Sequence, residues 1–355
     1  MGEGDSAEQR PRRRSSRPTQ ADVARIAGVS QTAVSYILNG KLQTTISDAT
    51  RQRVLAVIDE IGYVPDLTAR SLRSRRTMTI GAIIPDITNP FFPEFVRGIQ
   101  DVAQTGSYDV ITYNTDGQRS LELNAVDAAR RGRVDGLIMS TYQLTTADLG
   151  PTIAQAIPMV ILGEPDDLPL PADAPFDRVY VPGDDGAHAV TGYLAEQGHR
   201  RIATIVGSQH LANGVQRVAG YRRALTEHGI AADEGLLRWG DWSESSGYAC
   251  MNDLLALPSA QRPTAVFAAN DLIAVGAMLA CKAAGLKIPE DIAIAGYDNV
   301  ALAHLVMPPL TTLDQHPRQI GNAAARLLLE RLTGDFDGSS RTYRAAFDLV
   351  IRESA

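Results

Sequence analysis

The chain has 355 residues, of which 44% are hydrophobic and 21% are charged, a composition typical of a globular protein. It contains no apolar run of the roughly 18 residues that a spanning helix needs, and its first residues lack the apolar stretch of a secretory signal. The net charge of −7 is uneven: residues 1–76 hold 13 Lys and Arg against 8 Asp and Glu, and residues 77–355 hold 21 against 33. A basic segment on an acidic protein suggests a nucleic-acid-binding module.

Only two cysteines are present, Cys250 and Cys281, and their spacing suits neither a disulfide framework nor a metal site. We therefore expect unreactive thiols, a reducing and cytoplasmic setting, and no metal or other cofactor.

Residues 1–17 are polar and Arg-rich, and we expect a disordered basic tail. Arg12, Arg13 and Arg14 can add unspecific attraction to phosphates, or they can simply solubilise the chain.

A helix-turn-helix pattern begins at Thr19. Thr19 followed by Asp22 approximates a capping box, and an apolar stripe follows at helical spacing. Gly28 ends this first helix, and only residues 28–30 separate it from a second helix that Ser30 caps. A third helix, capped by Ser47 or Asp48, stops at residues 62–65. The basic segment 66–73 is too short to be a stable helix alone.

From residue 77 the pattern alternates between strands and helices, which predicts parallel sheets in two doubly wound lobes. The predicted strands are Ile80–Ile84, Val110–Tyr113, Gly136–Met139, Met159–Leu162, Ile202–Val206, Ala265–Ala268 and Ile292–Ala295. The predicted helices between them include Phe92–Gln104, Leu121–Gly132, Ala187–Gln197, Val215–Glu227 and Ala274–Ala284.

Six motifs in order resemble the lactose-repressor (LacI/GalR) family of bacterial transcriptional regulators. They are TQADVARIAGVSQTAVSYILN at 19–39, YVP with ARSL at 63–72, IIPDITNPFF at 83–92, GHRRIA at 198–203, ND with GYD at 270–298, and PPLTT at 308–312. The resemblance covers essentially the whole chain after residue 18.

The resemblance implies a small all-α helix-turn-helix head followed by an α/β, two-lobed effector domain like the periplasmic binding proteins, with parallel, doubly wound sheets. The head would span 18–64, a hinge helix and linker 65–76, and the effector-binding and dimerisation domain 77–355. Lobe 1 would hold about 77–180 and 314–340, and lobe 2 about 181–313 and 341–355.

The recognition helix of such a head enters the major groove with its N-terminal residues. By family position Gln31, Thr32 and Tyr36 read bases, and Tyr36 departs from the Arg that many members carry there. Phosphate contacts fall to Ser30, Ser35, Asn39 and Thr50, and Thr19 completes the DNA-binding set. Ser30 can equally act as a helix cap alone.

The hinge contributes Ala69 and Leu72. By resemblance Leu72 is a wedge in the minor groove, whereas the sequence alone also allows it to pack hinge against core. Asp66 stands where the family usually has Asn, and its charge makes a direct DNA contact doubtful. Two hinges side by side imply a homodimer on a pseudo-palindromic operator of double-stranded DNA.

The resemblance also implies an effector pocket for a small polyol. Its candidate residues are Asp86, Asn89, Phe91, Phe92, Arg217, Trp242, Asn270, Asp298 and Gln315. Asn270 and Asp298 follow apolar strands, at the edge where α/β sheets bind ligands. Trp242 can instead be a half-buried loop residue, and Phe92 can belong to the core. Gly163 stands where the lactose repressor has a carboxylate.

The function expected is thus a sequence-specific regulator, by family default a repressor, whose operator affinity is controlled by a sugar or sugar derivative. A purine or another metabolite is the alternative effector. An enzyme is disfavoured because no Ser-His-Asp order, phosphate loop or metal cluster stands out. A transport-type binding protein is disfavoured by the DNA-reading head.

Overall fold

A computed structural model describes residues 18–38, 46–64, 76–169, 171 and 174–355. The chain divides into two compact units, Met1–Thr77 and Met78–Ala355. Our predictions for the tail 1–17, for Asn39, and for Asp66, Ala69 and Leu72 in the hinge lie outside the described residues.

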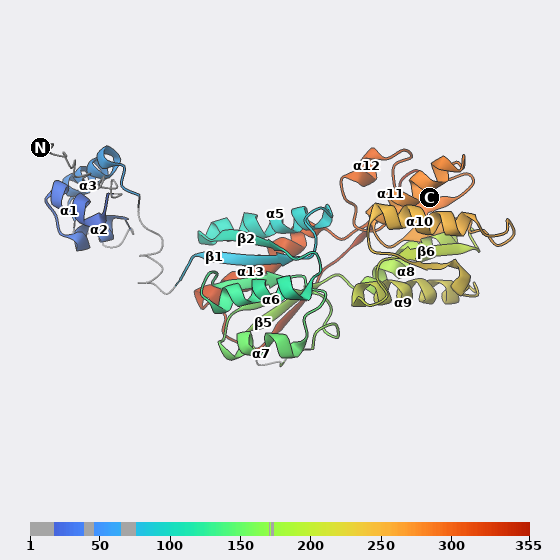
Figure 1. Ribbon diagram of the computed structural model, residues 1–355, viewed down its shortest axis with the longest axis horizontal. Helices are drawn as coiled ribbons and strands as arrows, with labels where there is room; N and C mark the ends of the chain where they lie inside the picture. Colours follow the sequence, from blue (N-terminus) through green and yellow to red (C-terminus); the bar gives the residue numbers. More distant parts are fainter. Residues whose placement is uncertain (1–17, 39–45, 65–75, 170, 172–173) are drawn as a thin grey trace, which may run out of the picture. The chain divides into compact units, whose positions relative to one another are not determined.

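The head contains α1 (Gln20–Ala27), α2 (Gln31–Leu38) and α3 (Asp48–Ile61) (Figure 1). Thr19 and Asp22 form a reciprocal capping box at α1, and Ser47 caps α3. Gly28 has a φ of 65° and closes α1 with a left-handed turn, which glycine adopts at little cost. The helices bury one shared apolar core, whose members are Val23, Ala24, Ala27, Val34, Ile37, Val54 and Val57. The three helices of the head are therefore present as predicted.

The first lobe of the larger unit is a six-stranded parallel sheet in the order β11-β5-β4-β3-β1-β2. Its strands are β1 (Thr79–Ile84), β2 (Asp109–Asn114), β3 (Gly136–Met139), β4 (Met159–Leu162), β5 (Phe176–Tyr180) and β11 (Arg341–Arg344). One face packs on α5 (Phe91–Ala103) and α13 (Pro317–Thr333), and the other on α6 (Arg119–Arg130) and α7 (Thr146–Ala154).

The second lobe is a four-stranded parallel sheet in the order β7-β6-β8-β9. Its strands are β6 (Ile202–Val206), β7 (Leu237–Trp239), β8 (Ala265–Ala268) and β9 (Ala293–Ala295). Helices α8 (Gly183–Glu196) and α9 (Ala212–Glu227) cover one face. Helices α10 (Glu244–Leu255), α11 (Asp271–Ala283) and α12 (Leu302–Leu305) cover the other. The predicted fold class, a helical head with a two-lobed parallel α/β domain, is confirmed.

The chain crosses between the lobes three times, after β5, after β10 (Thr312–Asp314) and after β11. Strand β12 (Asp348–Val350) pairs antiparallel with β10 beside these crossings. We predicted that residues 341–355 belong to the second lobe, and this prediction was wrong for residues 341–344. Arg341 pairs in register with Asp177 of β5 and contacts its carboxylate, so β11 is an edge strand of the first lobe.

Candidate functional sites

A cavity of about 300 Å³ lies between the two lobes of the larger unit, at the carboxyl ends of their strands. This volume is at the lower end of the range for small-molecule sites. Among the described residues that line it are eight of the nine predicted effector residues: Asn89, Phe91, Phe92, Arg217, Trp242, Asn270, Asp298 and Gln315.

Asp86 is the exception, because it is not among the residues that line the cavity. Its carboxylate accepts hydrogen bonds from the backbone N–H of Thr88 at 2.8 Å and from the Thr88 hydroxyl at 2.7 Å. This closes a local turn after β1, as Asp side chains often do. Asp86 therefore closes the turn before α5 through its Oδ1, and its role in effector binding stays a prediction.

Arg217 of α9 supplies the cation in the wall of the cavity, and its side chain is 10% exposed. The guanidinium lies 3.9 Å from the centroid of the Tyr297 ring and 5.2 Å from that of Trp242. Its Nη1 donates to the carbonyl of Ala269, and its Nη2 is 3.9 Å from a carboxylate oxygen of Asp298. Two aromatic faces and one carboxylate thus hold Arg217 in place.

Asp298 supplies a buried carboxylate opposite Arg217. It accepts a hydrogen bond of 2.5 Å from the side-chain amide of Gln315, which lies on the crossover after β10. Burial raises the pKa of Asp298 to about 6, although Arg217 and Gln315 act in the opposite direction. The residue therefore changes charge close to neutral pH.

Asn270 caps α11 and also fixes Trp242. Its Oδ1 accepts from the backbone N–H of Ile273 at 2.7 Å, and its Nδ2 donates to the carbonyl of Trp242 at 2.9 Å. Trp242 has a φ of 71°, and its indole ring lies against Gly207, where a Cβ atom would stand 1.9 Å from the ring. Both residues line the cavity. The side-chain oxygen and nitrogen of Asn270 are both hydrogen-bonded within the protein.

The first lobe contributes Asn89, Phe91 and Phe92. Asn89 accepts from the backbone N–H of Phe91 at 3.1 Å, at the start of α5. The two rings meet edge to face at 5.2 Å and are largely buried, in the same core as Ile84 and Ile320. Phe91 and Phe92 therefore serve both as core and as apolar wall.

Sequence reasoning missed several polar residues that line the cavity: Tyr142, Glu164, Asp167, His210, Asn213 and Gln216. They come from loops and a helix start outside the six motifs. Tyr142 is held by the buried carboxylate of Glu122, which accepts from its backbone N–H at 2.7 Å. Burial raises the pKa of Tyr142 to about 12, so its hydroxyl stays neutral.

The carboxylate of Asp167 lies beside Gly163. A Cβ atom at Gly163 would lie 3.3 Å from Asp167 Oδ2, so the Asp167 side chain fills the space beside the glycine. Asp167 also accepts a hydrogen bond of 2.8 Å from Gln216 of the second lobe. Burial raises the pKa of Asp167 and that of its neighbour Glu164.

Four buried polar atoms in residues that line this cavity have no hydrogen-bond partner among the described residues: Asn213 Oδ1, Arg217 Nε, Trp242 Nε1 and Tyr297 Oη. An unpaired buried polar atom costs free energy. These four atoms are themselves buried, so a ligand in the cavity reaches them only if the lining side chains move.

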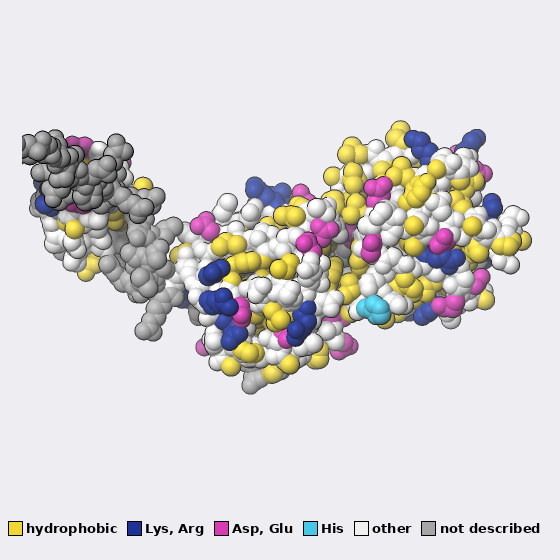
Figure 2. Space-filling view, viewed as in Figure 1, with side chains coloured by type: hydrophobic (Ala, Val, Ile, Leu, Met, Phe, Trp, Pro, Cys, Tyr) yellow, Lys and Arg dark blue, Asp and Glu magenta, His cyan; other side chains and the backbone are white. Residues whose placement is uncertain are grey.

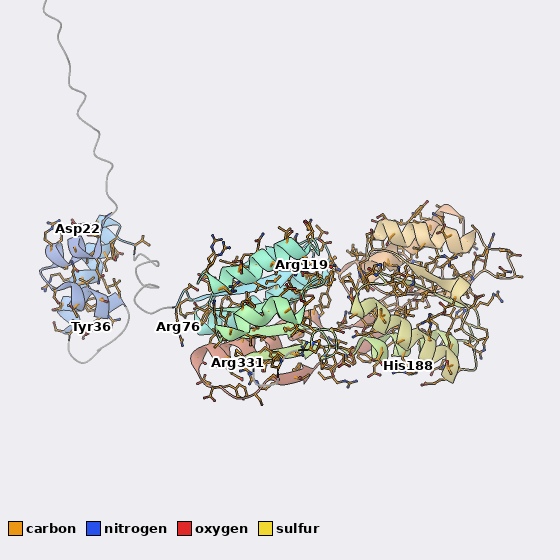
Figure 3. All side chains as sticks on the ribbon, turned by 60° about the horizontal axis from the view of Figure 1, so that its bottom comes forward. Asp22, Tyr36, Arg76, Arg119, His188 and Arg331 are labelled. Atoms are coloured by element: carbon orange, nitrogen blue, oxygen red, sulfur yellow. The ribbon has the colours of Figure 1, made fainter. Side chains whose placement is uncertain are left out.

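On the head, Gln31, Thr32 and Tyr36 are exposed on α2, opposite the buried Val34 and Ile37. Figure 3 marks Tyr36 at the surface of the head. The side-chain amide of Gln20 donates to the carbonyl of Gln31 at 3.0 Å and ties the start of α2 to α1. This face of α2 presents the three predicted base readers together.

Most of the residues predicted to contact phosphates have side chains that are hydrogen-bonded within the head itself. Thr19 belongs to the capping box, Ser30 accepts from the N–H of Ala33 at 3.1 Å, and Thr50 lies 2.9 Å from the Ser47 hydroxyl. Ser35 is half-buried on α2. A helix N-terminus can bind a phosphate while its cap is in place, so the two roles of Ser30 are compatible.

Neither a metal site nor a membrane span is evident in the described part of the chain. Its His, Cys, Asp and Glu side chains form no group of three that could hold a metal ion. None of its helices has both the length and the hydrophobicity needed to cross a bilayer.

Two segments of the chain match known families. Residues 19–66 match the family described as bacterial regulatory proteins, lacI family. Residues 191–355 match the periplasmic binding protein-like domain.

Individual relatives match over nearly the full length. The HTH-type transcriptional repressor PurR of Vibrio atlanticus is 35% identical over 95% of this chain and 98% of its own. The PurR repressor of Photobacterium profundum is 33% identical over 95% and 98%.

Solved structures show the same architecture. A complex of the transcriptional regulator CelR with cellobiose is 32% identical and covers 96% of this chain and 100% of its own, with a TM-score of 0.70. The lac repressor dimer bound to operator and the anti-inducer ONPF is 28% identical over 95% and 98%, with a TM-score of 0.81.

Proposed function

The chain belongs to the lacI family of bacterial regulatory proteins, as a DNA-binding transcriptional repressor and not an enzyme, and we propose that a sugar or sugar derivative in the interlobe cavity controls its operator affinity. We further propose that it acts in the cytoplasm as a homodimer on a pseudo-palindromic operator.

The mixture of polar side chains that line the cavity carries the proposal for the effector. Arg217 is a donor, Asp167 and Asp298 are acceptors when ionised, and Asn213 and Gln216 can do both. A hydroxyl group both donates and accepts, so a polyol suits such a mixed set. The aromatic faces of Trp242 and Phe91 suit the apolar side of a sugar ring. The cellobiose complex of CelR, a relative of similar length, agrees with this chemistry.

The lining also argues against an anionic effector. It carries the carboxylates of Glu164, Asp167 and Asp298 against the single guanidinium of Arg217, which already faces Asp298. A phosphorylated sugar or a nucleotide would bring further negative charge into this site. A neutral ligand is therefore favoured.

A purine is the second candidate, because relatives 35% and 33% identical to this chain are repressors named PurR. A planar base would stack on Trp242 and use the same donors and acceptors.

Tryptophan fluorescence separates the two candidates. The only two tryptophans are Trp239 and Trp242, and the second lines the cavity. We would titrate the protein with cellobiose, ribose and hypoxanthine and confirm binding by calorimetry. Saturable quenching or enhancement with a sugar alone supports the proposal, and a response to hypoxanthine alone replaces it with the purine alternative. A response to none of the three counts against both.

The DNA-binding proposal rests on the exposed side chains of Gln31, Thr32 and Tyr36. Gln pairs with adenine through two hydrogen bonds, and Thr can contact a thymine methyl. Selection from a random duplex library at stated salt tests it. A palindrome with a flexible central step supports a dimer with Leu72 as wedge, and retention without sequence preference contradicts the proposal.

The homodimer proposal is supported by exposed hydrophobic side chains on the second lobe, where Figure 2 shows such side chains over α12 and its surroundings. Met307 is 84% exposed and Leu305 is 74% exposed, and Ile351 and Leu279 are also well exposed. Sedimentation of Leu305→Glu with Met307→Glu tests this surface. We expect monomers, whereas Val215→Glu, at an exposed site on α9, stays dimeric.

The regulatory mechanism follows from the three crossovers. An effector that binds the closed lobes more tightly than the open lobes shifts their equilibrium, by no more than that difference in affinity. The motion reaches the DNA through the hinge residues that precede β1. Either an inducer or a corepressor can use this mechanism.

A further inference from the structure

Asp271 is a buried carboxylate that stands behind the cavity wall. It is the first residue of α11, directly after Asn270, and only 1% exposed. Its Oδ2 accepts from the backbone N–H of Val300 at 2.8 Å, and its Oδ1 accepts from the Thr312 hydroxyl at 2.5 Å. A Cβ atom at Gly296 would lie 2.3 Å from Oδ1, so the turn packs directly on the carboxylate.

The turn that Asp271 holds carries part of the effector site. Gly296–Val300 follows β9 and presents Tyr297 and Asp298 to the cavity. Asp298 and Asn299 have φ values of 119° and 54°, a conformation that non-glycine residues rarely adopt. Two such residues in succession persist only where surrounding contacts fix them. The bond to Val300 fixes the end of this turn.

The second partner of Asp271 lies on a different segment. Thr312 is on the crossover strand β10, and Gln315 follows three residues later. Gln315 donates a hydrogen bond to the carboxylate of Asp298. The turn after β9 and the segment after β10 therefore meet at Asp298. Asp271 thus joins the turn that carries Asp298 to β10, the strand that directly precedes Gln315. Its side-chain contacts add to two backbone hydrogen bonds of 2.8 Å between the turn and this segment, from Gly296 to Thr311 and from Asp298 to Leu313.

We propose that Asp271 is a positioning residue of the effector site, which fixes the turn Gly296–Val300 against β10 so that Asp298 faces Arg217 and Gln315. This role in binding rests on the proposed function of the cavity. Asp271 itself does not touch the effector.

Two substitutions distinguish a positioning role of the Asp271 side chain from an effect of its charge. In Asp271→Asn, Oδ1 accepts from Val300 N–H while Nδ2 donates to the Thr312 oxygen, so both contacts persist. In Asp271→Ala both contacts are lost. Burial and the nearby Asp298 raise the pKa of Asp271 to about 8. The neutral Asn therefore tests the contacts without the charge.

The test uses the full chain with Trp239→Phe, which leaves Trp242 as the sole tryptophan. Trp242 lies 5.2 Å from Arg217, which faces Asp298, so its emission reports the ionisation of Asp298. The charged or titratable groups that face Asp298 are Arg217 from α9, Asp271 from α11, Asp314 from β10, Tyr297 of the same turn and Tyr142 from the first lobe. Asp298→Asn in the same background identifies the Asp298 transition against other groups such as His210.

We expect the parent to show an emission transition with a midpoint near 6, which Asp298→Asn removes. Asp271→Ala should lose this transition and Asp271→Asn should retain it, with circular dichroism showing that each variant is folded. If Asp271→Ala does not fold, Thr312→Val removes one of the two contacts at nearly constant shape and should also weaken the transition.

Three results overturn the proposal: a parent without the transition, an Asp271→Ala protein with the parent's transition, or an Asp271→Asn protein as defective as Asp271→Ala. The measurement needs no effector. A failed effector screen therefore contradicts the proposed function without deciding this test.

Discussion

The side-chain amide of Gln315 donates to the carboxylate of Asp298 across 2.5 Å and joins the crossover after β10 to the turn after β9. Gln315 is 8% exposed and Asp298 is 5% exposed. One amide and a guanidinium 3.9 Å away leave the carboxylate incompletely compensated for the loss of water. A ligand hydroxyl would supply the missing donor.

The cost of this buried carboxylate is measurable in the free protein. The pKa of Asp298 in the fold is about 6, above its ordinary value of 3.8, so stability is lost as the pH rises from about 4 to about 6. We expect Asp298→Asn to be more stable than the parent at pH 7, by up to about 3 kcal/mol, with no gain at about pH 4. Urea unfolding at the two pH values measures this, with the exposed Asp166→Asn as control. A less stable variant at pH 7 would contradict the assignment.

The position of Trp242 depends on Gly207. A Cβ atom there would stand 1.9 Å from the indole ring, so Gly207→Ala must displace Trp242. We expect at least about tenfold weaker effector binding, equivalent to about 1.4 kcal/mol, although Gly207 supplies no side-chain contact. Gly150→Ala is the matched control because its Cβ would meet nothing within 4 Å. The affinities are measured by calorimetry with the sugar or purine that binds the parent. If Gly207→Ala binds it as tightly as the parent does, the position of the indole ring does not affect binding.

Local signals were enough to predict the head and much of the cavity. The Thr19–Asp22 box and the left-handed Gly28 are short-range features, and both are present as expected. Asn270 and Asp298 were found because residues at the carboxyl ends of parallel strands meet at one edge.

The remaining features depend on partners that are distant in the sequence. Glu122 holds the backbone of Tyr142, and Asp271 holds that of Val300, 20 and 29 residues away, with no local pattern to announce either. Asp86 has a near neighbour as its partner instead, because Thr88 donates two hydrogen bonds to its Oδ1. Strand β11 is exposed and polar, so its apolar pattern is too weak to reveal an edge strand.

If the head reads bases, substitutions in α2 should change the sequence specificity of DNA binding without changing its salt dependence. We expect Gln31→Ala and Thr32→Ala each to weaken binding to the selected operator by about 1–3 kcal/mol and to relax specificity at one position. The slope of affinity against salt should not change, because no phosphate contact is lost. Gln52→Ala, exposed on α3, is the control. Equal losses on operator and on random DNA would assign these residues to the phosphate backbone instead.

Asp177 anchors the edge of the first lobe. It is fully buried and lies 2.8 Å from Arg331 and 2.9 Å from Arg341 of β11. Figure 3 marks Arg331 within the first lobe. Burial alone would raise the pKa of Asp177, but the hydrogen bonds from the two arginines outweigh it, and the pKa is lowered. This contribution to stability is present above the ordinary pKa and is lost as the pH falls through the lowered value.

Removing one partner of a buried ion pair typically costs about 3–5 kcal/mol, because the other charge stays buried. We therefore expect Asp177→Ala to lower the free energy of unfolding by about that much and to release β11, seen as faster hydrogen exchange at residues 341–344. Glu330→Gln is the control, since Glu330 pairs with the same Arg341 but is 47% exposed, and a change of no more than about 1 kcal/mol is expected. If both variants unfold like the parent, β11 is held by its backbone pairing alone, and the ion pairs do not set the boundary of the lobe.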